Sequence, residues 1–400
     1  MRLRTPLVLL HRWFGLALAL FLFISGLTGA VISWDHELDA WLNPQLFQAA
    51  SGKHRAGTKN GLQLARQVEA NDARLRVNYT LTALEPGHAA LMSVEGRLDP
   101  ASGKPYALGF NQLAVDPVTG KLQGTRQWGE VSLARENLLP FLYKLHYTMH
   151  IPDARGIELG VWFMGMIGIV WFVDCFIALY LSFPNLRSWR KSLAFRWREK
   201  GHRLNFDLHR SGGVWVWLLL LILAVTSISM NLPTQVMRPL VAKFSTLSPN
   251  AFDSRTPQPP EKPVEPLLTR EQVVALAKTE ATRRGWTLPA GGVFYSSGYG
   301  LYGVGFFEAD NDHGDGGLGN AWLYFDGRDG SPAGGVIPGT GSAGDIFLQS
   351  QFPLHSGRII GLPGRILISA MGLMVAMLSA TGLIIWLRKR RARLVKTIQL

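Results

Sequence analysis

Long apolar runs recur along the chain and dominate its pattern of hydrophobic and polar positions. They contain one charged residue, Asp174, and they cover residues 13–34, 159–183, 211–233 and 366–387. Each run has at least the roughly 20 residues that an α-helix needs to cross the hydrocarbon core of a bilayer. Backbone polar groups must be bonded internally in lipid, so the pattern predicts four transmembrane helices.

The segments between the first and second runs and between the third and fourth runs have mixed patterns. Apolar residues at helical spacing predict helices over 61–78 and 269–284, the second with Thr269 as N-cap and Gln272 at N3. Alternation of apolar and polar residues predicts strands at 79–84, 91–94, 294–307 and 321–325. Aspartate and glycine stand at turn positions in 116–120 and 326–330. Each segment is therefore expected to form a small α+β domain.

The chain is internally duplicated. Leu-His-Arg occurs at His11 and again at His209, and a glycine follows each histidine four residues later. A threonine stands 17 residues beyond each histidine, as Thr28 and Thr226. The repeat predicts two halves that each cross the membrane twice.

The predicted fold is an α-helical membrane protein, with four transmembrane helices from a two-fold internal repeat and two α+β domains outside the cytoplasm. The expected segments are an N-terminus with helix 1 (1–34), an α+β domain (35–145), a histidine segment with helix 2 (146–183), a basic loop (184–208), helix 3 (209–232), a second α+β domain (233–354), a histidine segment with helix 4 (355–387) and a basic tail (388–400).

Charge sets the expected orientation. The net charge is +13, and seventeen basic residues against two acidic ones lie in the N-terminus, in 184–210 and in the tail. Positive residues collect on the cytoplasmic side of membrane proteins, so both termini and the basic loop are expected in the cytoplasm and both α+β domains in the periplasm. The basic balance therefore reflects topology in a bacterial inner membrane, and no nucleic-acid partner is expected.

Five histidines stand at the expected ends of the transmembrane helices. His11 and His209 lie at the cytoplasmic ends of helices 1 and 3, and His146, His150 and His355 precede helices 2 and 4 at the outer side. Neutral imidazole is the usual axial ligand of b-type haem, and two histidines on facing helices can clamp one flat macrocycle.

The duplication predicts two such centres. His11 pairs with His209, and His355 pairs with either His146 or His150. His150 and His355 each precede a glycine by six residues, which favours His150. The sequence has one cysteine, Cys175, and no C-x-x-C-H motif, so the two haems b would be bound without covalent links. The other five histidines are expected to be ordinary loop or domain residues: His36, His54, His88, His202 and His313.

Asp174 is the acid within a predicted membrane helix. An ionisable residue there indicates a functional role by default. A proton relay, a partner for an arginine and a contact that merely stabilises the bundle all remain open.

Several short motifs resemble the PepSY-associated transmembrane proteins over nearly the whole chain. They are Leu-His-Arg-Trp-Phe-Gly at 10–15, Val-Asp-Pro-Val-Thr-Gly at 115–120, Asp-Cys-Phe at 174–176, Asp-Leu-His-Arg at 207–210, Pro-Leu-His-Ser-Gly-Arg at 353–358 and Gly-Leu-Pro-Gly at 361–364. The chain is most similar to the group that includes di-haem inner-membrane ferrisiderophore reductases. This resemblance implies PepSY-like periplasmic domains, two bis-histidine haems and reduction of a ferric siderophore, and the family's Leu-His-Tyr pattern favours His146 over His150.

The expected function is therefore that of a haem-dependent ferric-siderophore reductase, which passes electrons from the cytoplasmic side to a periplasmic ferric siderophore and releases iron. The loop 184–210 has 27 residues, too few for a nucleotide-binding domain, so a cytoplasmic flavin reductase or quinol is expected as electron donor. The alternative is a PepSY-type periplasmic binding or regulatory membrane protein without redox activity. A metal permease would need more acids in the helices than Asp174.

Overall fold

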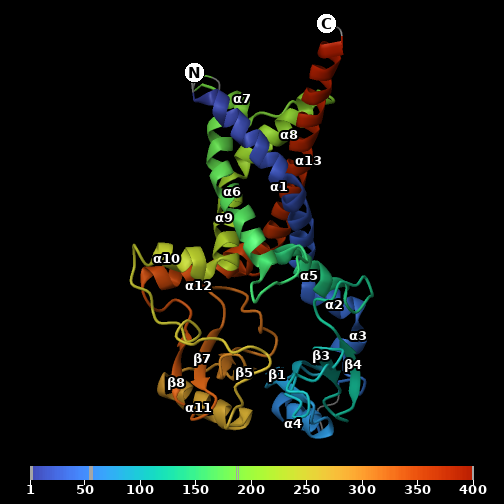
Figure 1. The fold of residues 1–400 in the computed structure, drawn as a ribbon, viewed down its shortest axis with the longest axis vertical. Coiled ribbons are helices and arrows are strands. Elements are labelled where there is room, and N and C mark those ends of the chain that lie inside the picture. Colours follow the sequence, from blue (N-terminus) through green and yellow to red (C-terminus); the bar gives the residue numbers. More distant parts are fainter. Residues whose placement is uncertain (1–2, 54–56, 186, 188, 399–400) are drawn as a thin grey trace. The chain divides into compact units, whose positions relative to one another are not determined.

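The computed structural model describes residues 3–53, 57–185, 187 and 189–398 (Figure 1). The chain divides into two compact units. A helical unit contains Met1–Trp34, Leu142–Phe244 and Ser350–Leu400. A sheet unit contains Asp35–Phe141 and Ser245–Gln349.

Helices make up the helical unit. They are α1 (Arg4–Ile32), the greater part of α5 (Leu138–Thr148), α6 (Leu159–Ser182), α7 (Trp189–Leu193), α8 (His202–Trp215), α9 (Trp217–Asn231), α10 (Arg238–Val241), half of α12 (Ala343–Ser356) and α13 (Leu362–Ile398). Among the described residues, α1, α6 and α13 are each long and apolar enough to cross a membrane, and α8 with α9 makes a fourth span if this bent pair is counted as one. The predicted membrane architecture is confirmed at this level.

The third predicted span differs from a straight helix. The chain bends by 70° between α8 and α9. Val216 lies at the break, with φ −105° and ψ 10°. Sharp bends in helices commonly occur near glycines, and Gly212 and Gly213 stand just before this one. Helix α8 begins at His202, so the helix that carries His209 extends well before the apolar run.

Two glycines bring α1 and α13 into close backbone contact (Figure 1). A Cβ atom built on Gly26 would lie 2.5 Å from the carbonyl oxygen of Gly372, and one built on Gly372 would meet the carbonyl oxygen of Gly26. Helices in lipid associate through such small residues, because apolar side chains gain little by leaving an equally apolar solvent. The first and the last long helices of the chain, α1 and α13, are therefore in direct contact.

The sheet unit is one antiparallel sheet with short helices. Its helices are α2 (Asp35–Leu42), α3 (Pro44–Phe47), α4 (Gly61–Asn71) and α11 (Arg270–Arg283). Its strands are β1 (Leu75–Leu81), β2 (Ala90–Gly96), β3 (Gln112–Val115), β4 (Leu122–Arg126), β5 (Ala290–Ser296), β6 (Leu301–Phe306), β7 (Ala321–Asp326) and β8 (Pro332–Val336). The strand order is β4-β3-β2-β1-β5-β6-β7-β8.

The two α+β segments thus share one sheet. Strand β1 of the first segment pairs with β5 of the second, with Tyr79 opposite Phe294. In each segment one helix, α4 or α11, directly precedes four strands that are arranged in the same order from the centre of the sheet outward. The duplication seen in the sequence is therefore repeated in the topology of this unit, and the pairing of β1 with β5 joins its halves.

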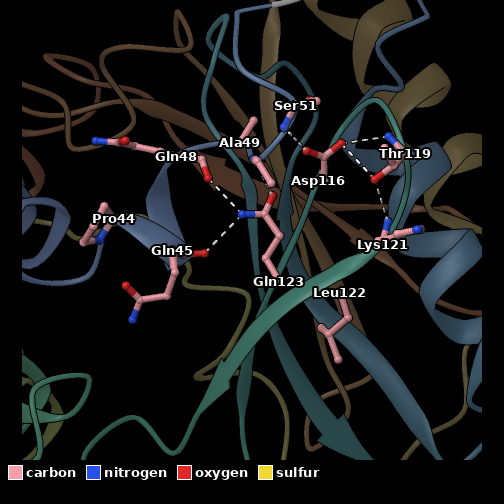
Figure 2. A pocket seen from close by; sticks show the side chains of 11 residues that line it. Pro44, Gln45, Gln48, Ala49, Ser51, Asp116, Thr119, Lys121, Leu122 and Gln123 are labelled. Carbon is pink, nitrogen blue, oxygen red and sulfur yellow. Dashed lines mark hydrogen bonds between the residues drawn. The ribbon is translucent and has the colours of Figure 1, made fainter.

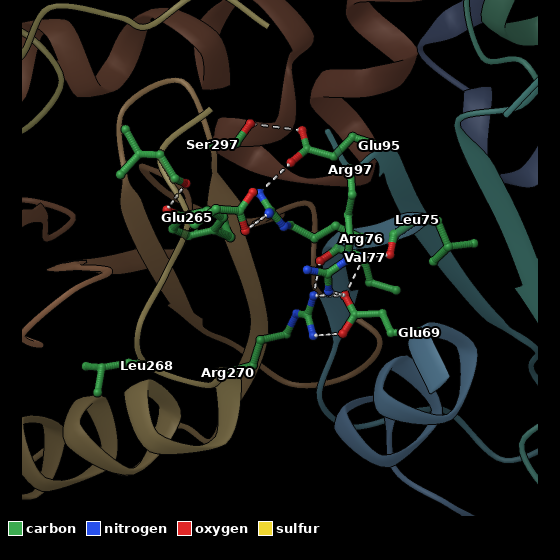
Figure 3. A network of polar contacts seen from close by, with 12 residues as sticks. Glu69, Leu75, Arg76, Val77, Glu95, Arg97, Glu265, Leu268, Arg270 and Ser297 are labelled. Carbon is green, nitrogen blue, oxygen red and sulfur yellow. Dashed lines mark hydrogen bonds and ion pairs between the residues drawn. The ribbon is translucent and has the colours of Figure 1, made fainter. Parts of the chain in front are cut away.

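Charged side chains reinforce this join (Figure 3). Arg76 on β1 is buried and pairs with Glu265 and with Glu95, the latter at 3.3 Å. Arg270 at the start of α11 donates to Glu69 on α4 at 3.0 Å. The contacts of Arg76 with Glu265 and of Arg270 with Glu69 run between the two segments and tie them together.

The structure confirms one of the local predictions for the sheet unit and corrects two others. The N-cap Thr269 and its partner Gln272 are confirmed as a capping box at the start of α11. The predicted helix over 61–78 ends at Asn71, because Leu75 and Val77 are buried strand residues of β1. The predicted strand over 294–307 is wrong as a single element. It is a hairpin of β5 and β6, with Gly300 in its turn at φ +67°.

The two Asp-to-Gly turns are confirmed. The backbone N–H of Gly120 donates to the carbonyl oxygen of Asp116 at 2.8 Å, and that of Gly330 donates to Asp326 at 3.0 Å. Both glycines have positive φ, +71° and +72°. Such a backbone is favourable for glycine because it has no Cβ atom.

Candidate functional site

Four of the five candidate histidines lie in two pairs within the helical unit. The rings of His11 on α1 and His209 on α8 have centroids 6.1 Å apart, with planes at 44°. The rings of His146 on α5 and His355 on α12 also have centroids 6.1 Å apart, with planes at 65°. Each pair joins a histidine of the first half to one of the second half. These are called the His11–His209 pair and the His146–His355 pair.

Helix α1 supports the ring of His146. Its Nδ1 lies 3.0 Å from the carbonyl oxygen of Ser25 and 3.1 Å from the hydroxyl of Thr28. A carbonyl oxygen can accept but not donate, so Nδ1 carries the hydrogen. The Thr28 hydroxyl donates its own hydrogen to Ile24 O at 2.8 Å, which leaves its oxygen free to accept from the imidazole.

His355 has the equivalent support in the second half. Its Nδ1 lies 2.9 Å from the hydroxyl of Thr226 on α9. That hydroxyl donates to Ile222 O at 2.8 Å, so its oxygen accepts from Nδ1. Thr226 and Thr28 are the threonines that stand 17 residues after His209 and His11. The repeat therefore supplies both imidazoles of this pair with matching threonine partners.

The His11–His209 pair is supported differently on its two sides. Nδ1 of His209 donates to the carbonyl oxygen of Leu378 at 3.0 Å and lies 3.2 Å from the hydroxyl of Thr381 on α13. Nδ1 of His11 lies 2.9 and 3.0 Å from the two carboxyl oxygens of Asp174 on α6. The acid within the membrane spans therefore contacts an imidazole.

All four imidazoles consequently share one hydrogen-bonding pattern. Each has its Nδ1 bonded to an oxygen acceptor, and within the described part of the chain no group bonds any of their Nε2 atoms. A neutral imidazole protonated at Nδ1 keeps its lone pair on Nε2, which is the form that binds a metal. Histidine ligands in metalloproteins are held in the same way by a bond from the other nitrogen.

The spacing within each pair suits one metal between two rings. Two imidazoles on opposite sides of a metal, at about 2 Å per bond, would have centroids roughly 6 Å apart. The 6.1 Å separation of both pairs fits this arrangement. No group of three or more His, Cys, Asp or Glu side chains suited to a metal ion occurs among the described residues.

Glycines make room for two of the four rings. A Cβ atom on Gly29 would lie 2.9 Å from Cε1 of His146, and one on Gly382 would lie 2.9 Å from Cε1 of His209. Both contacts are too close for a side chain, so glycine lets each ring pack against a helix. Gly15 follows His11 by four residues, so the two lie on the same face of α1. A Cβ atom on Gly15 would meet nothing within 4 Å. Open space therefore lies beside Gly15.

His150 does not belong to either pair of rings. Helix α5 ends at Thr148, and both Met149 and His150 have φ of +53°. The backbone N–H of His150 donates to the Thr148 hydroxyl at 3.1 Å. The ring that faces His355 is that of His146. The six-residue spacing to a glycine is thus a weaker guide than the helix end, because the turn after Thr148 changes the direction of the following residues.

The supporting residues were not predicted as such from the sequence. Thr28 and Thr226 were part of the repeat, but nothing local identified them as partners of His146 and His355. Asp174 accepts from His11, and no described arginine pairs with it. The position of Asp174 alone in an apolar run could have predicted a hydrogen-bond donor opposite it, because a buried acid requires one.

The other histidines lie elsewhere. His36 and His313 are in the sheet unit, where their ring centroids are 5.4 Å apart. His88 lies 3.4 Å from Glu85, and the ring of His202 contacts Phe206. His54 lies outside the described residues.

A cavity of about 670 Å³ lies in the sheet unit beside α3 and β4 (Figure 2). Its polar groups bond one another. Nε2 of Gln123 donates to Gln48 O at 2.9 Å, and the Asp116 carboxylate accepts from the backbone N–H of Ser51 at 2.7 Å. Burial alone would raise the pKa of Asp116, but bonds from Thr119 and Ser51 lower it to about 2. The Gln123 amide and the Asp116 carboxylate are therefore used within the fold.

Comparison of the sequence with known families finds a match. Residues 8–389, which include both histidine pairs, match the model of a family described as PepSY-associated TM region. No curated protein matches the chain.

Proposed function

This chain belongs to the PepSY-associated TM region family, and from that premise we propose that it is a di-haem b-type oxidoreductase of a bacterial inner membrane. In this proposal it passes electrons from the cytoplasmic side to a periplasmic ferric siderophore. Iron is released because Fe(II) is held less tightly than Fe(III) by hard oxygen ligands. A cytoplasmic flavin reductase or quinol supplies the electrons, one for each Fe(III).

One observation carries the proposal. Two pairs of imidazoles have the same 6.1 Å separation, and each imidazole is bonded through Nδ1 so that Nε2 keeps its lone pair. His11 and His209 would hold one haem, and His146 and His355 the other. A haem between two imidazoles supplies reversible one-electron chemistry at its iron.

The positions of the pairs support transfer across the membrane. His11 and Thr28, the partner of His146, are both on α1 and 17 residues apart. At about 1.5 Å of rise per residue, this corresponds to roughly 25 Å along the helix. One centre could not serve both faces of a bilayer whose core is about 30 Å thick, whereas two centres near opposite ends of α1 could.

The proposed orientation has both termini and the loop 184–208 in the cytoplasm. It rests on the excess of basic residues in those parts of the chain. A reporter enzyme that is active only in the periplasm should be active when inserted in the exposed turn at Ser102 and inactive at Lys200. Activity at Lys200 alone would reverse the orientation.

The function is tested on the purified full chain. We expect a Soret band and two haems per chain. After anaerobic chemical reduction, each chain should yield two Fe(II) when mixed with a ferric siderophore, as measured with a ferrous-specific chelator. A colourless protein would refute the proposal and support a PepSY-type binding or regulatory role. A haem-loaded protein that yields no Fe(II) would support the proposed cofactors but refute the ferric siderophore as substrate.

A further inference from the structure

Asp174 distinguishes one of the four imidazoles from the others. His209 and His146 each have a backbone carbonyl as an Nδ1 partner, and His355 has a threonine hydroxyl. These partners are neutral. His11 alone of the four has a carboxyl group, which contacts it through both oxygens at 2.9 and 3.0 Å.

Asp174 occupies an energetically unfavourable position for an acid. The residue is 8% exposed within α6, one of the helices suited to span a membrane. Among the described residues, His11 is its ion-pair partner, and neither lysine nor arginine contacts it. An acid in lipid is unfavourable and indicates function. At the matching place in the second half, α13 offers His209 a carbonyl and a hydroxyl instead, so an imidazole of this pair can be supported without an acid.

We infer that Asp174 is a positioning residue which acts through His11 to lower the reduction potential of the centre at the His11–His209 pair below that of the centre at the His146–His355 pair. This inference rests on the proposed function. It assigns to Asp174 the direction of electron transfer, which the two similar histidine pairs would not determine by themselves.

The physical basis is charge donation. A carboxylate that accepts from Nδ1–H makes the imidazole more basic, and a more basic ligand favours ferric over ferrous iron. The negative charge also stabilises the oxidised centre directly, since it carries one more positive charge than the reduced centre and is poorly screened in lipid. Neutral partners provide much less of either effect. An electron that enters at the His11–His209 pair is therefore favoured to move to the His146–His355 pair, and no proton or further reactant is needed.

The experiment is an anaerobic optical redox titration of the full chain with both haems bound. The wild type should show two midpoint potentials. His209→Ala, which removes the His11–His209 centre, should abolish the lower one. If it abolishes the higher one, the inference is overturned without any change at Asp174.

Variants at Asp174 then test the cause. Asp174→Asn keeps an oxygen acceptor but removes the charge. It should raise the lower midpoint and leave the higher one unchanged, so that electron partition between the centres changes at least tenfold, or about 59 mV for one electron. Asp174→Glu should restore most of the difference. Thr381→Val, the matched change beside His209, should cause a much smaller shift because Leu378 O still accepts from Nδ1.

The possible failures can be told apart. Two haems with both midpoints unchanged in Asp174→Asn would refute the inference and leave the proposed function intact. A wild type that binds no haem would refute the proposed function, and the inference with it. If Asp174→Asn loses one haem, the comparison of wild type with His209→Ala decides the order of the potentials, and Asp174→Glu decides whether the carboxylate sets it.

Discussion

The His11–His209 and His146–His355 pairs have the same ring separation but different surroundings. At the His146–His355 pair each imidazole has a threonine from the preceding span, Thr28 or Thr226, and His146 also contacts Ser25 O. At the His11–His209 pair the two halves have diverged, and an acid supports one ring while a carbonyl and a hydroxyl support the other. The two halves therefore pair their imidazoles at the same spacing but differ in the groups that bond Nδ1.

The difference suggests a division of roles. Ligands that must meet a metal are limited by bond length and direction, so they change little between repeats. Their hydrogen-bond partners can change without losing the metal, and they adjust its electronic properties. One pair with neutral partners and one pair with a carboxyl partner are what the proposed electron transfer in a preferred direction would need.

Removing a ligand gives the largest expected effect. His209→Ala and His355→Ala should each lower haem content from two to one per chain, because one imidazole is then left without its opposite partner. His150→Ala is the matched control and should keep two haems, since His150 lies beyond the end of α5. Haem is measured per protein by pyridine haemochrome. Two haems in His355→Ala, or one in His150→Ala, would show that the second pair has been wrongly assigned.

Removing a supporting hydroxyl should have an intermediate effect. Thr226→Val leaves Nδ1 of His355 without its described acceptor, whereas Thr28→Val leaves His146 bonded to Ser25 O. Loss of such a partner typically weakens metal binding about 10- to 100-fold, so Thr226→Val should lose haem to apomyoglobin faster than Thr28→Val. Equal rates in the two variants would mean that the bonds seen at Nδ1 do not hold these rings.

Filling the space against a ring should give the smallest effect. Gly29→Ala and Gly382→Ala place a methyl group 2.9 Å from Cε1 of His146 and His209, so each ring must shift by several tenths of an ångström. We expect about tenfold faster haem loss, confined to the pair concerned. Gly213→Ala is the control, because its Cβ would lie 3.8 Å from Leu378, an ordinary contact. If Gly29→Ala and Gly382→Ala change different optical signals, each glycine serves its own pair. If Gly213→Ala loses haem equally fast, the effect is not specific to glycines that contact a ring.

The sequence by itself determined those features that depend on near neighbours. Apolar runs free of charge predict spans, because lipid excludes unbonded backbone and charge wherever the run occurs. The capping box at Thr269 and the Asp-to-Gly turns could also be predicted, because their hydrogen bonds join residues only a few positions apart. The repeated Leu-His-Arg identified two candidate ligands without any knowledge of how the helices pack.

Tertiary structure decided which distant residues meet. The pairing of β1 with β5, the bend at Val216 and the partner of Asp174 all depend on contacts between segments far apart in the chain. The choice between His146 and His150 had the same origin. Two signals in the sequence disagreed, and the end of α5 at Thr148 turns His146, not His150, toward His355. Spacing along a chain cannot specify which side chains face each other once a helix ends, because that depends on the direction the backbone takes and on what packs against it.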